Sequence, residues 1–424
     1  MPDLARPTIP GLVPLYLGPL ATPPADRPAL VGPDELAAID AAGTDVAALL
    51  DHARTIGARA PFPGDGRTAG LWGALASLAA TDVGAARVVE PHLDALAILG
   101  QVPVPVALDA VGAGPDSTWG VYAAEGPGVR LEAHERDGAW VLSGTKPWCS
   151  LAADLSHALV TAWTDAGRRL FAVGLRSPGV VPADGPWVAR GLAQVVSAAV
   201  RFDDVPAVPV GAPGWYLERP GFAWGGIGVA ACWWGGAVGL ARTHRDALTA
   251  REPDQLALAH LGATDRALAA GRAVLAEAAS AVDAGVEGPD ASLLARRVRG
   301  VVAEVVEEGQ RRCAHALGPG PLTTDERFAR RRADLGRAAR GGPGRAAGRA
   351  RLGRAPRRRR GRRPLAHLAR GRADPRSRAT DGHPRGDHPH RLPDDGGVLR
   401  VPADGRAQPA RRRLRRRTRR RHGP

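Results

Sequence analysis

The spacing of apolar residues predicts helices in the first part of the chain. Apolar residues recur three or four positions apart, as at Leu36 and Ile39 and again at Trp72 and Leu75. This spacing is typical of amphipathic helices. Prolines and glycines at positions 61–66 separate the two stretches. We therefore predict an N-terminal helical domain over residues 1–115.

The pattern changes near Trp119 to an alternation of apolar and polar residues. Leu131 and Ala133 alternate with polar side chains, and Asp137 and Gly138 then provide a tight turn. Alternation also marks residues 157–163, 170–175 and 196–202. These signals predict an antiparallel β-domain over residues 116–211.

Helical spacing returns after residue 225. One apolar stripe repeats every seven residues, as in helices that pack against other helices, at Leu261, Leu268, Leu275 and Val282. Further helices are expected over residues 227–250 and 290–316, and a fourth begins near Asp325 and stops within about one to three turns. The pattern predicts an α+β fold that ends in a truncated helical bundle over residues 212–335, with the stripe exposed on its open side.

The composition changes sharply after Leu335. Up to that residue the chain has 29 Lys and Arg against 37 Asp and Glu, net −8, whereas residues 336–424 have 29 Arg against 6 Asp, net +23. All ten Trp, three Tyr and five Phe precede this point, so the tail cannot build a core and is expected to be disordered. Because Arg, Ala, Gly and Pro have codons rich in G and C, we interpret residues 336–424 as out-of-frame translation. A basic tail that binds nucleic acid and a solvated linker are the alternatives.

Cysteine usage and the N-terminus indicate the compartment. Cys149, Cys232 and Cys313 lie far apart, with no CxxC pair and no histidine at ligand spacing, so we expect buried thiols in a reducing compartment and no metal site. The apolar stretch at residues 8–20 is broken by prolines and follows no basic stretch. We therefore predict a cytoplasmic protein without membrane insertion.

Residues 142–150, Leu-Ser-Gly-Thr-Lys-Pro-Trp-Cys-Ser, place Trp148 and Ser150 at the end of a predicted strand. A large aromatic ring there can cover a planar heterocycle, and a hydroxyl two residues on faces the same side of the strand. An ordinary core tryptophan is the alternative. The segment resembles G-x-K-x-W-I-T/S of the acyl-CoA dehydrogenases, with Cys149 in place of Ile, and the resemblance extends over residues 30–335. It implies that Trp148 packs against the flavin ring of FAD and that Ser150 lies at its polar edge.

Residues 121–128 resemble the family's T-E-P-x-G segment, in which backbone groups and a Thr side chain hold the pyrimidine end of the flavin. The resemblance implies backbone contacts from Ala123 and Ala124. Ala124 stands where the Thr would be, so the hydroxyl contact is lost. Glu125 corresponds to the family's Glu, and we interpret it as a turn residue rather than as an acid or base.

Residues 315–322 resemble the family's Q-x-x-G-G-x-G turn, which touches the adenine end of the neighbouring subunit's FAD. His315 replaces the Gln, Gly318 matches the first Gly, and Pro319 replaces the second. An ordinary helix stop is the alternative. The resemblance implies a homodimer or homotetramer. Residues 225–241 resemble the family's first bundle helix, whose glycines either admit cofactor and substrate or allow close helix packing.

In this family a Glu abstracts the α-proton of an acyl thioester while hydride passes to the flavin. Residues 227–250 contain no Glu, and their one carboxylate, Asp246, lies beside His244 and Arg245 on a stretch that we interpret as solvated. The family's other position for this Glu falls in residues 336–424, which contain no Glu either. No catalytic base is therefore assigned, and an inactive chain is one alternative.

The resemblance predicts an FAD-dependent oxidoreductase of the acyl-CoA dehydrogenase type, acting on a small molecule such as an acyl-CoA. The sequence does not indicate the electron acceptor. One alternative is a flavin monooxygenase of the same fold, which needs no such base. The other alternative is a non-catalytic protein whose basic tail binds nucleic acid. The sequence favours this hypothesis less.

Overall fold

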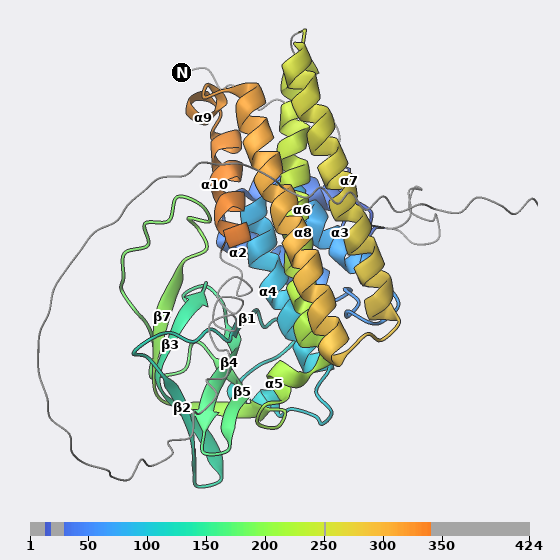
Figure 1. The fold of residues 1–424 in the computed structure, drawn as a ribbon. Coiled ribbons are helices and arrows are strands. Elements are labelled where there is room, and N and C mark those ends of the chain that lie inside the picture. Colours follow the sequence, from blue (N-terminus) through green and yellow to red (C-terminus); the bar gives the residue numbers. More distant parts are fainter. Residues whose placement is uncertain (1–12, 18–28, 250–251, 341–424) are drawn as a thin grey trace, which may run out of the picture. The chain divides into compact units, whose positions relative to one another are not determined.

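The computed structural model describes residues 13–17, 29–249 and 252–340 (Figure 1). The helices are α1 (Pro33–Ala42), α2 (Val46–Gly57), α3 (Thr68–Thr81), α4 (Val83–Gly100), the short 3-10 helix η1 (Leu108–Val111), α5 (Trp215–Glu218), α6 (Pro220–Thr249), α7 (Gln255–Asp283), α8 (Gly288–Leu317), α9 (Pro321–Thr324) and α10 (Glu326–Arg340). The strands are β1 (Trp119–Tyr122), β2 (Leu131–Arg136), β3 (Ala139–Ser150), β4 (His157–Thr164), β5 (Gly167–Gly174), β6 (Val180–Pro182) and β7 (Ser197–Val210). The predictions for residues 341–424 lie outside the described residues. Within those residues, no helix combines the length and apolar character needed to cross a membrane.

The N-terminal helices α1 to α4 confirm the helical spacing of this region. Asp45 caps α2 and Asp82 caps α4, because each side chain accepts a hydrogen bond from a backbone N–H in the first turn. Helix α3 is buried on all sides from Leu71 to Thr81. A helix that is apolar all round belongs in a core, and α3 contacts both α4 and α6.

The strands form one mixed sheet, so the predicted antiparallel β-domain is wrong in part. Their order is β1-β4-β2-β3-β7-β5, with β6 paired to β7 and β5 also paired to β4. Strand β4 is parallel to β1 and, through the pair of Glu132 and Trp163, to β2, whereas the other pairs are antiparallel. Alternating residues look the same in parallel and antiparallel strands, and turn signals identify only hairpin neighbours. The pairing of β1 with β4, which are separated by the β2–β3 hairpin, therefore depends on tertiary structure.

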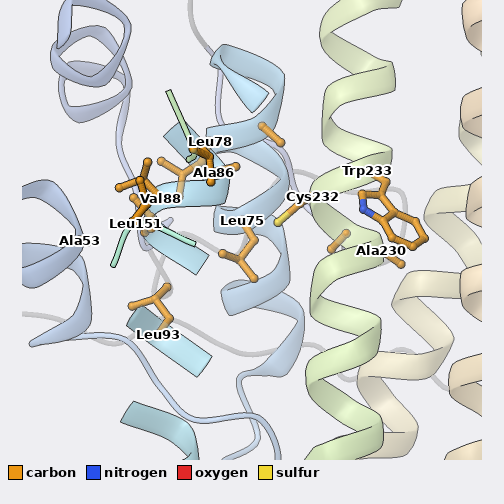
Figure 2. Packing of buried hydrophobic residues seen from close by; sticks show 14 of the residues in the cluster. Ala53, Leu75, Leu78, Ala86, Val88, Leu93, Leu151, Ala230, Cys232 and Trp233 are labelled. Carbon is orange, nitrogen blue, oxygen red and sulfur yellow. The ribbon is translucent and has the colours of Figure 1, made fainter. Parts of the chain in front are cut away.

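Helices α6, α7 and α8 run side by side and confirm the three predicted bundle helices (Figure 1). Helix α3 packs against α6, and Figure 2 shows Leu75 and Cys232 at this contact. A methyl group on Gly235 would collide with the carbonyl oxygen of Ala76, and one on Gly239 would lie 2.5 Å from the carbonyl oxygen of Ala80. These two glycines therefore serve close helix packing.

The stripe on α7 is covered, which corrects the prediction of an open side. Leu275 and Val282 are fully buried, and Leu268 is half-buried against the main core. Helices α3, α6 and α8 all contact α7, so its apolar face does not require the fourth helix. That fourth helix, α10, is also longer than predicted: it has 15 residues and continues past Leu335, which is itself fully buried.

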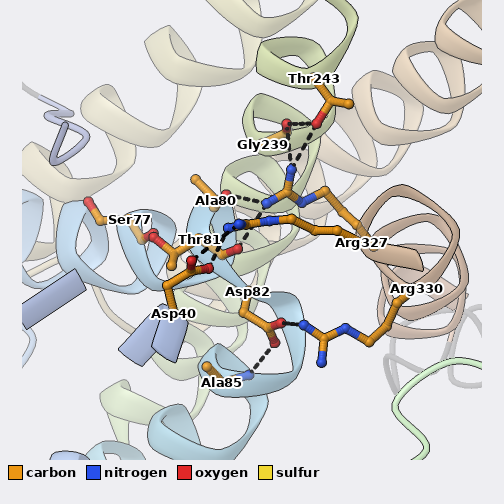
Figure 3. Close-up of polar contacts among 11 residues, drawn as sticks. Asp40, Ser77, Ala80, Thr81, Asp82, Ala85, Gly239, Thr243, Arg327 and Arg330 are labelled. Carbon is orange, nitrogen blue, oxygen red and sulfur yellow. Dashed lines mark hydrogen bonds and ion pairs between the residues drawn. The ribbon is translucent and has the colours of Figure 1, made fainter. Parts of the chain in front are cut away.

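Arginines of α10 attach this helix to the N-terminal helices (Figure 3). Arg327 pairs with Asp40, and Arg330 pairs at 2.5 Å with Asp82, the capping residue of α4. Both carboxylates belong to segments far away in sequence. These ion pairs explain why a helix rich in arginine is part of the fold rather than the start of the tail.

A third arginine of α10, Arg331, is buried and donates hydrogen bonds to backbone carbonyls. Its guanidinium reaches the carbonyl oxygens of Ala80 and Thr81 at the end of α3, and that of Gly239 in α6, at 2.9–3.1 Å. The carbonyl oxygens at the C-terminus of a helix have no hydrogen-bond donors within the helix. A cationic side chain there can supply such donors. Burial lowers the pKa of Arg331 to about 10.

Candidate functional site

Trp148 stands at an irregular point near the end of β3. The pairing of β3 with β7 shifts register between Lys146 and Cys149, and Trp148 adopts a left-handed backbone conformation with φ 60°. This conformation is uncommon for a bulky residue and costs of order 1–3 kcal/mol. It leaves the indole 61% exposed, whereas Cys149 beside it is fully buried. The ring can therefore cover a flat ligand, and it is not the core tryptophan of the alternative interpretation.

The turn after β1 lies beside this strand. A methyl group on Gly126 would lie 3.2 Å from the ring of Pro147, so the turn and the residue before Trp148 are in contact distance. Ala123 is half-buried and Ala124 is exposed. In the described part of the chain, no backbone–backbone hydrogen bond outside the strands involves either alanine. Their peptide groups can therefore serve a ligand next to Trp148.

An ion pair between a buried lysine and an exposed glutamate fixes the turn to β3, and sequence reasoning missed it. The Nζ atom of Lys146 donates to Glu125 Oε1 at 2.8 Å and to Thr161 Oγ1 at 2.9 Å. Trp163 Nε1 donates to the other oxygen of Glu125 at 3.4 Å, and Arg168 lies 3.6 Å from the carboxylate. With its oxygens engaged by three residues, Glu125 has a positioning role, in agreement with its interpretation as a turn residue.

The composition held a signal for this pair. Lys146 is the only lysine among 58 Lys and Arg, and its side chain is 2% exposed. A lysine presents a compact charge with three donors, whereas the planar arginine fork needs more room. Burial lowers the pKa of Lys146, and the hydrogen bond that Lys146 donates to Glu125 opposes that effect. A single lysine in an arginine-rich chain therefore marks a position with a specific geometric demand.

Ser150 lies at the end of β3 and is engaged with β7. Its Oγ is 2.7 Å from Oγ of Ser197, which in turn donates to the carbonyl oxygen of Val195 at 3.2 Å. Because Ser197 donates its hydroxyl proton to Val195, Ser150 must be the donor in the bond between the two serines. The lone pairs of the Ser150 hydroxyl therefore remain able to accept a hydrogen bond. Tyr122 holds the same segment by donating its hydroxyl to the carbonyl oxygen of Ser150 at 2.9 Å. Ser150 is therefore suited to accept a hydrogen bond from a ligand N–H.

The other two predicted site residues lie at the end of α8. His315 is exposed, with its ring centre 5.8 Å from that of His260 on α7. Gly318 follows the helix with φ 67° and donates its N–H to the carbonyl oxygen of Ala314, as a helix stop does. No contact in the described part of the chain joins these residues to Trp148. The structure thus brings together the turn and Trp148–Ser150, but not His315 and Gly318.

Helix α6 contains no Glu, and the interpretation of its last turns is partly corrected. Arg245 and Asp246 are exposed and pair with each other at 2.7 Å, as expected of a solvated stretch. His244 is fully buried instead, because it faces the bundle. Desolvation lowers the pKa of His244. The described residues also contain no cluster of His, Cys, Asp and Glu that could hold a metal ion.

Solved structures with the same architecture are flavoproteins. KijD3, in complex with FMN and dTDP-3-amino-2,3,6-trideoxy-4-keto-3-methyl-D-glucose, is 22% identical over 78% of this chain and 92% of its own, with a TM-score of 0.60. The chain has the acyl-CoA dehydrogenase fold. Glutaryl-CoA dehydrogenase from Mycobacterium smegmatis is 18% identical over 71% of this chain and 85% of its own, with a TM-score of 0.57. The nitrososynthase from Micromonospora carbonacea var. africana is 21% identical over 72% and 89%, with a TM-score of 0.58.

No protein-family model matches the chain, and no curated protein matches it in sequence. At the identities of the solved structures, the likeness establishes the fold. The residues of this acyl-CoA dehydrogenase fold fit a flavin on their own chemistry. Trp148 offers an exposed aromatic face, Ala123 and Ala124 offer backbone groups, and Ser150 offers an acceptor.

Proposed function

We propose that the chain is a flavin-dependent oxidoreductase that uses FAD and acts on a small molecule. The observation that carries this proposal is the juxtaposition of the exposed Trp148 with the turn at Ala123 and Ala124, fixed by the ion pair of the buried Lys146 with Glu125. An exposed indole on a strained backbone needs a functional reason. A flavin supplies one, because its ring is flat and its pyrimidine edge carries hydrogen-bonding groups.

Each residue has a separate task in this proposal. Trp148 covers one face of the ring and excludes water from it, while the peptide groups of Ala123 and Ala124 and the hydroxyl of Ser150 orient its polar edge. Lys146 holds the turn in place through Glu125. When bound, a flavin accepts or donates hydride and, once reduced, reacts with oxygen.

The second candidate is a flavin-dependent monooxygenase of the same fold, which is compatible with the absence of Glu from α6. Dehydrogenation of an acyl thioester needs a base for the α-proton, and the carboxylate of α6, Asp246, is exposed and already paired with Arg245. Oxygenation by reduced flavin needs no such base. Among solved structures of this fold, TdsC from Paenibacillus sp. A11-2 is found in a complex with FMN and indole.

A flavin titration tests the proposal. The purified protein is mixed with FAD or FMN, unbound flavin is removed, and the visible flavin absorbance is measured. We expect Trp148→Ala to weaken retention about tenfold, because stacking of a flat ring on an aromatic side chain contributes about 1–3 kcal/mol. Phe222→Ala is the matched control, since Phe222 is also exposed but lies on α6. A protein that stays colourless at saturating flavin contradicts the proposal.

The enzyme class is tested on the flavin-loaded protein. Bleaching of the flavin by an acyl-CoA without oxygen supports dehydrogenation. Product formation only with a reductant and oxygen supports the oxygenase.

A homodimer or homotetramer is part of the same proposal. His315 and Gly318 do not contact Trp148, and the turn that they resemble in the acyl-CoA dehydrogenases touches the FAD of a neighbouring copy of the chain. A protein that binds flavin as a monomer, with affinity unchanged by His315→Ala, removes this part of the proposal.

A further inference from the structure

A small hollow lies between the loop before α3, helices α3 and α4, and the first turns of α6. Its volume is about 30 Å³, which gives room for about two groups of the size of a water molecule. Its apolar walls come from Phe62, Leu71, Trp72, Leu75 and Leu93. Phe62 at its rim is half-buried, so the hollow is within reach of the surface.

Two glycines of α6 line the hollow and keep it open. A methyl group on Gly225 would lie 2.9 Å from Oδ1 of Asp94, and one on Gly228 would lie 3.3 Å from Nε1 of Trp72. These glycines face side chains, whereas Gly235 faces the backbone of α3. Glycines of α6 thus have two functions. Gly225 and Gly228 border the hollow, whereas Gly235 allows close packing against α3.

The two carboxylates on the hollow differ in their partners. Glu90 forms an ion pair with Arg87 at 2.5 Å and is buried. Asp94 forms no hydrogen bond or close ion pair in the described part of the chain. Its charged neighbours act from a greater distance: burial and then Glu90 raise the pKa of Asp94 to about 6, against the attraction of Arg219 and Arg87.

A donor without a partner faces the same space. Trp72 is 1% exposed, and its indole N–H forms no hydrogen bond with any described residue. The N–H of Trp72 and the carboxylate of the half-buried Asp94 are not fully enclosed by protein, so both stay open to a small molecule in the hollow. Gly225 and Gly228 are three residues apart on one helix, so the positions above them are about 5–6 Å apart. Asp94 and Trp72 thus approach neighbouring positions on one face of α6, and both line the hollow, where one small ligand can meet both.

We propose that the hollow binds a hydroxyl group of the substrate, which donates to Asp94 and accepts from Nε1–H of Trp72. This assignment rests on the proposed function in taking the ligand as substrate. A hydroxyl is both donor and acceptor, whereas an ammonium has no lone pair for Trp72 and a carboxylate is repelled by Asp94 and Glu90. The apolar walls of the hollow leave room for the hydroxyl and the carbon atom that bears it.

The test compares 1-propanol, propylammonium and propionate at neutral pH, which have similar size and different head groups. Binding to the full chain is followed by the indole N–H signals in proton–nitrogen NMR spectra, with the signal of Trp72 identified by its loss in Trp72→Phe. We expect propanol to shift that signal and the two ions to leave it unchanged. Asp94→Ala should weaken propanol binding about tenfold, the loss of one hydrogen bond to a charged group.

Two further variants complete the test. Asp265→Ala, which removes an exposed aspartate of α7, should bind propanol as the unaltered chain does. Gly225→Ala places a methyl group against Asp94 and should also weaken binding, so it replaces Asp94→Ala if that variant does not fold. Propylammonium binding as tightly as propanol, propanol binding that Asp94→Ala leaves unchanged, or a hollow that holds only water would overturn the assignment.

Flavin absorbance in the same samples separates this inference from the proposed function. Binding of propanol that depends on Asp94 in a protein without flavin affinity supports the hollow and refutes the flavin enzyme. A flavin-loaded protein that does not bind propanol supports the flavin enzyme and refutes the hydroxyl site.

Discussion

The turn at Glu125 and the hollow at Asp94 both place a carboxylate beside apolar surface, but they differ in how many partners the carboxylate has. Glu125 is engaged by Lys146, Trp163 and Arg168, whereas Asp94 has no close partner among the described residues. A saturated carboxylate holds the backbone in place and has little capacity left for a ligand. An unsatisfied one keeps its capacity to bind. The comparison indicates that Glu125 builds a site and that Asp94 contacts what enters one.

The largest effect is expected from Lys146→Met, which removes the charge from the saturated site at similar volume. Glu125 then keeps only weaker partners, and the free energy of unfolding should fall by about 2 kcal/mol, because a partly buried charge loses its main donor. Flavin retention should fall with it, since the turn is no longer fixed. Denaturant unfolding and flavin absorbance measure the two effects. Arg130→Met, which removes an exposed cation nearby, is the control, and equal effects from both variants would refute the special role of Lys146.

At Asp94 we expect a substitution to raise the free energy of unfolding rather than lower it. The pKa of Asp94, about 6, lies above its ordinary value of 3.8, so the folded protein binds a proton that the unfolded chain releases. The stability from this proton is present below about pH 4 and is lost as the pH rises through 6. Asp94→Asn should therefore raise the unfolding free energy at pH 7 by about 1 kcal/mol, after allowance for partial exposure. Thermal unfolding across this pH range checks it, and a variant less stable than the unaltered chain at pH 7 would break the comparison.

A smaller change in stability is expected from Trp148→Ala, although its effect on flavin is large. The indole is 61% exposed, so its loss should alter the unfolding free energy by no more than about 0.5 kcal/mol. A loss of several kcal/mol would show that Trp148 supports the fold rather than a ligand. Denaturant unfolding without added flavin distinguishes the two roles.

The smallest effect is expected from deletion of residues 341–424, which follow the last described helix. We expect flavin retention and propanol binding to remain unchanged, because both sites are formed by residues before Arg340. Retention on immobilised DNA tests the alternative of a nucleic-acid-binding tail. Strong retention by the full chain that falls steeply with salt and disappears on deletion would favour that alternative.

Much of the local structure could be predicted from the sequence. Apolar spacing identified the helical region before residue 100 and the bundle helices α6, α7 and α8, whereas η1 and α5 were missed. Alternation identified most strands, and Asp325 at the start of α10 does cap it through the N–H of Phe328. The motif around Trp148 predicted an aromatic ring that covers a flat cofactor. The side chain is 61% exposed, and its contact with a flavin stays a prediction. These features depend on residues close in sequence, which is the range over which periodicity and capping act.

Only the tertiary structure decided which distant residues meet. The parallel pairing of β1 with β4, the burial of His244, and the covering of Leu275 and Val282 depend on partners far along the chain. Spacing carries no information on such partners. A lone lysine and a turn glutamate thus became one ion pair, and glycines of one helix were divided between packing and a hollow. The physical reason is that register, burial and electrostatic pairing are fixed when elements pack, whereas the sequence pattern fixes only the elements themselves.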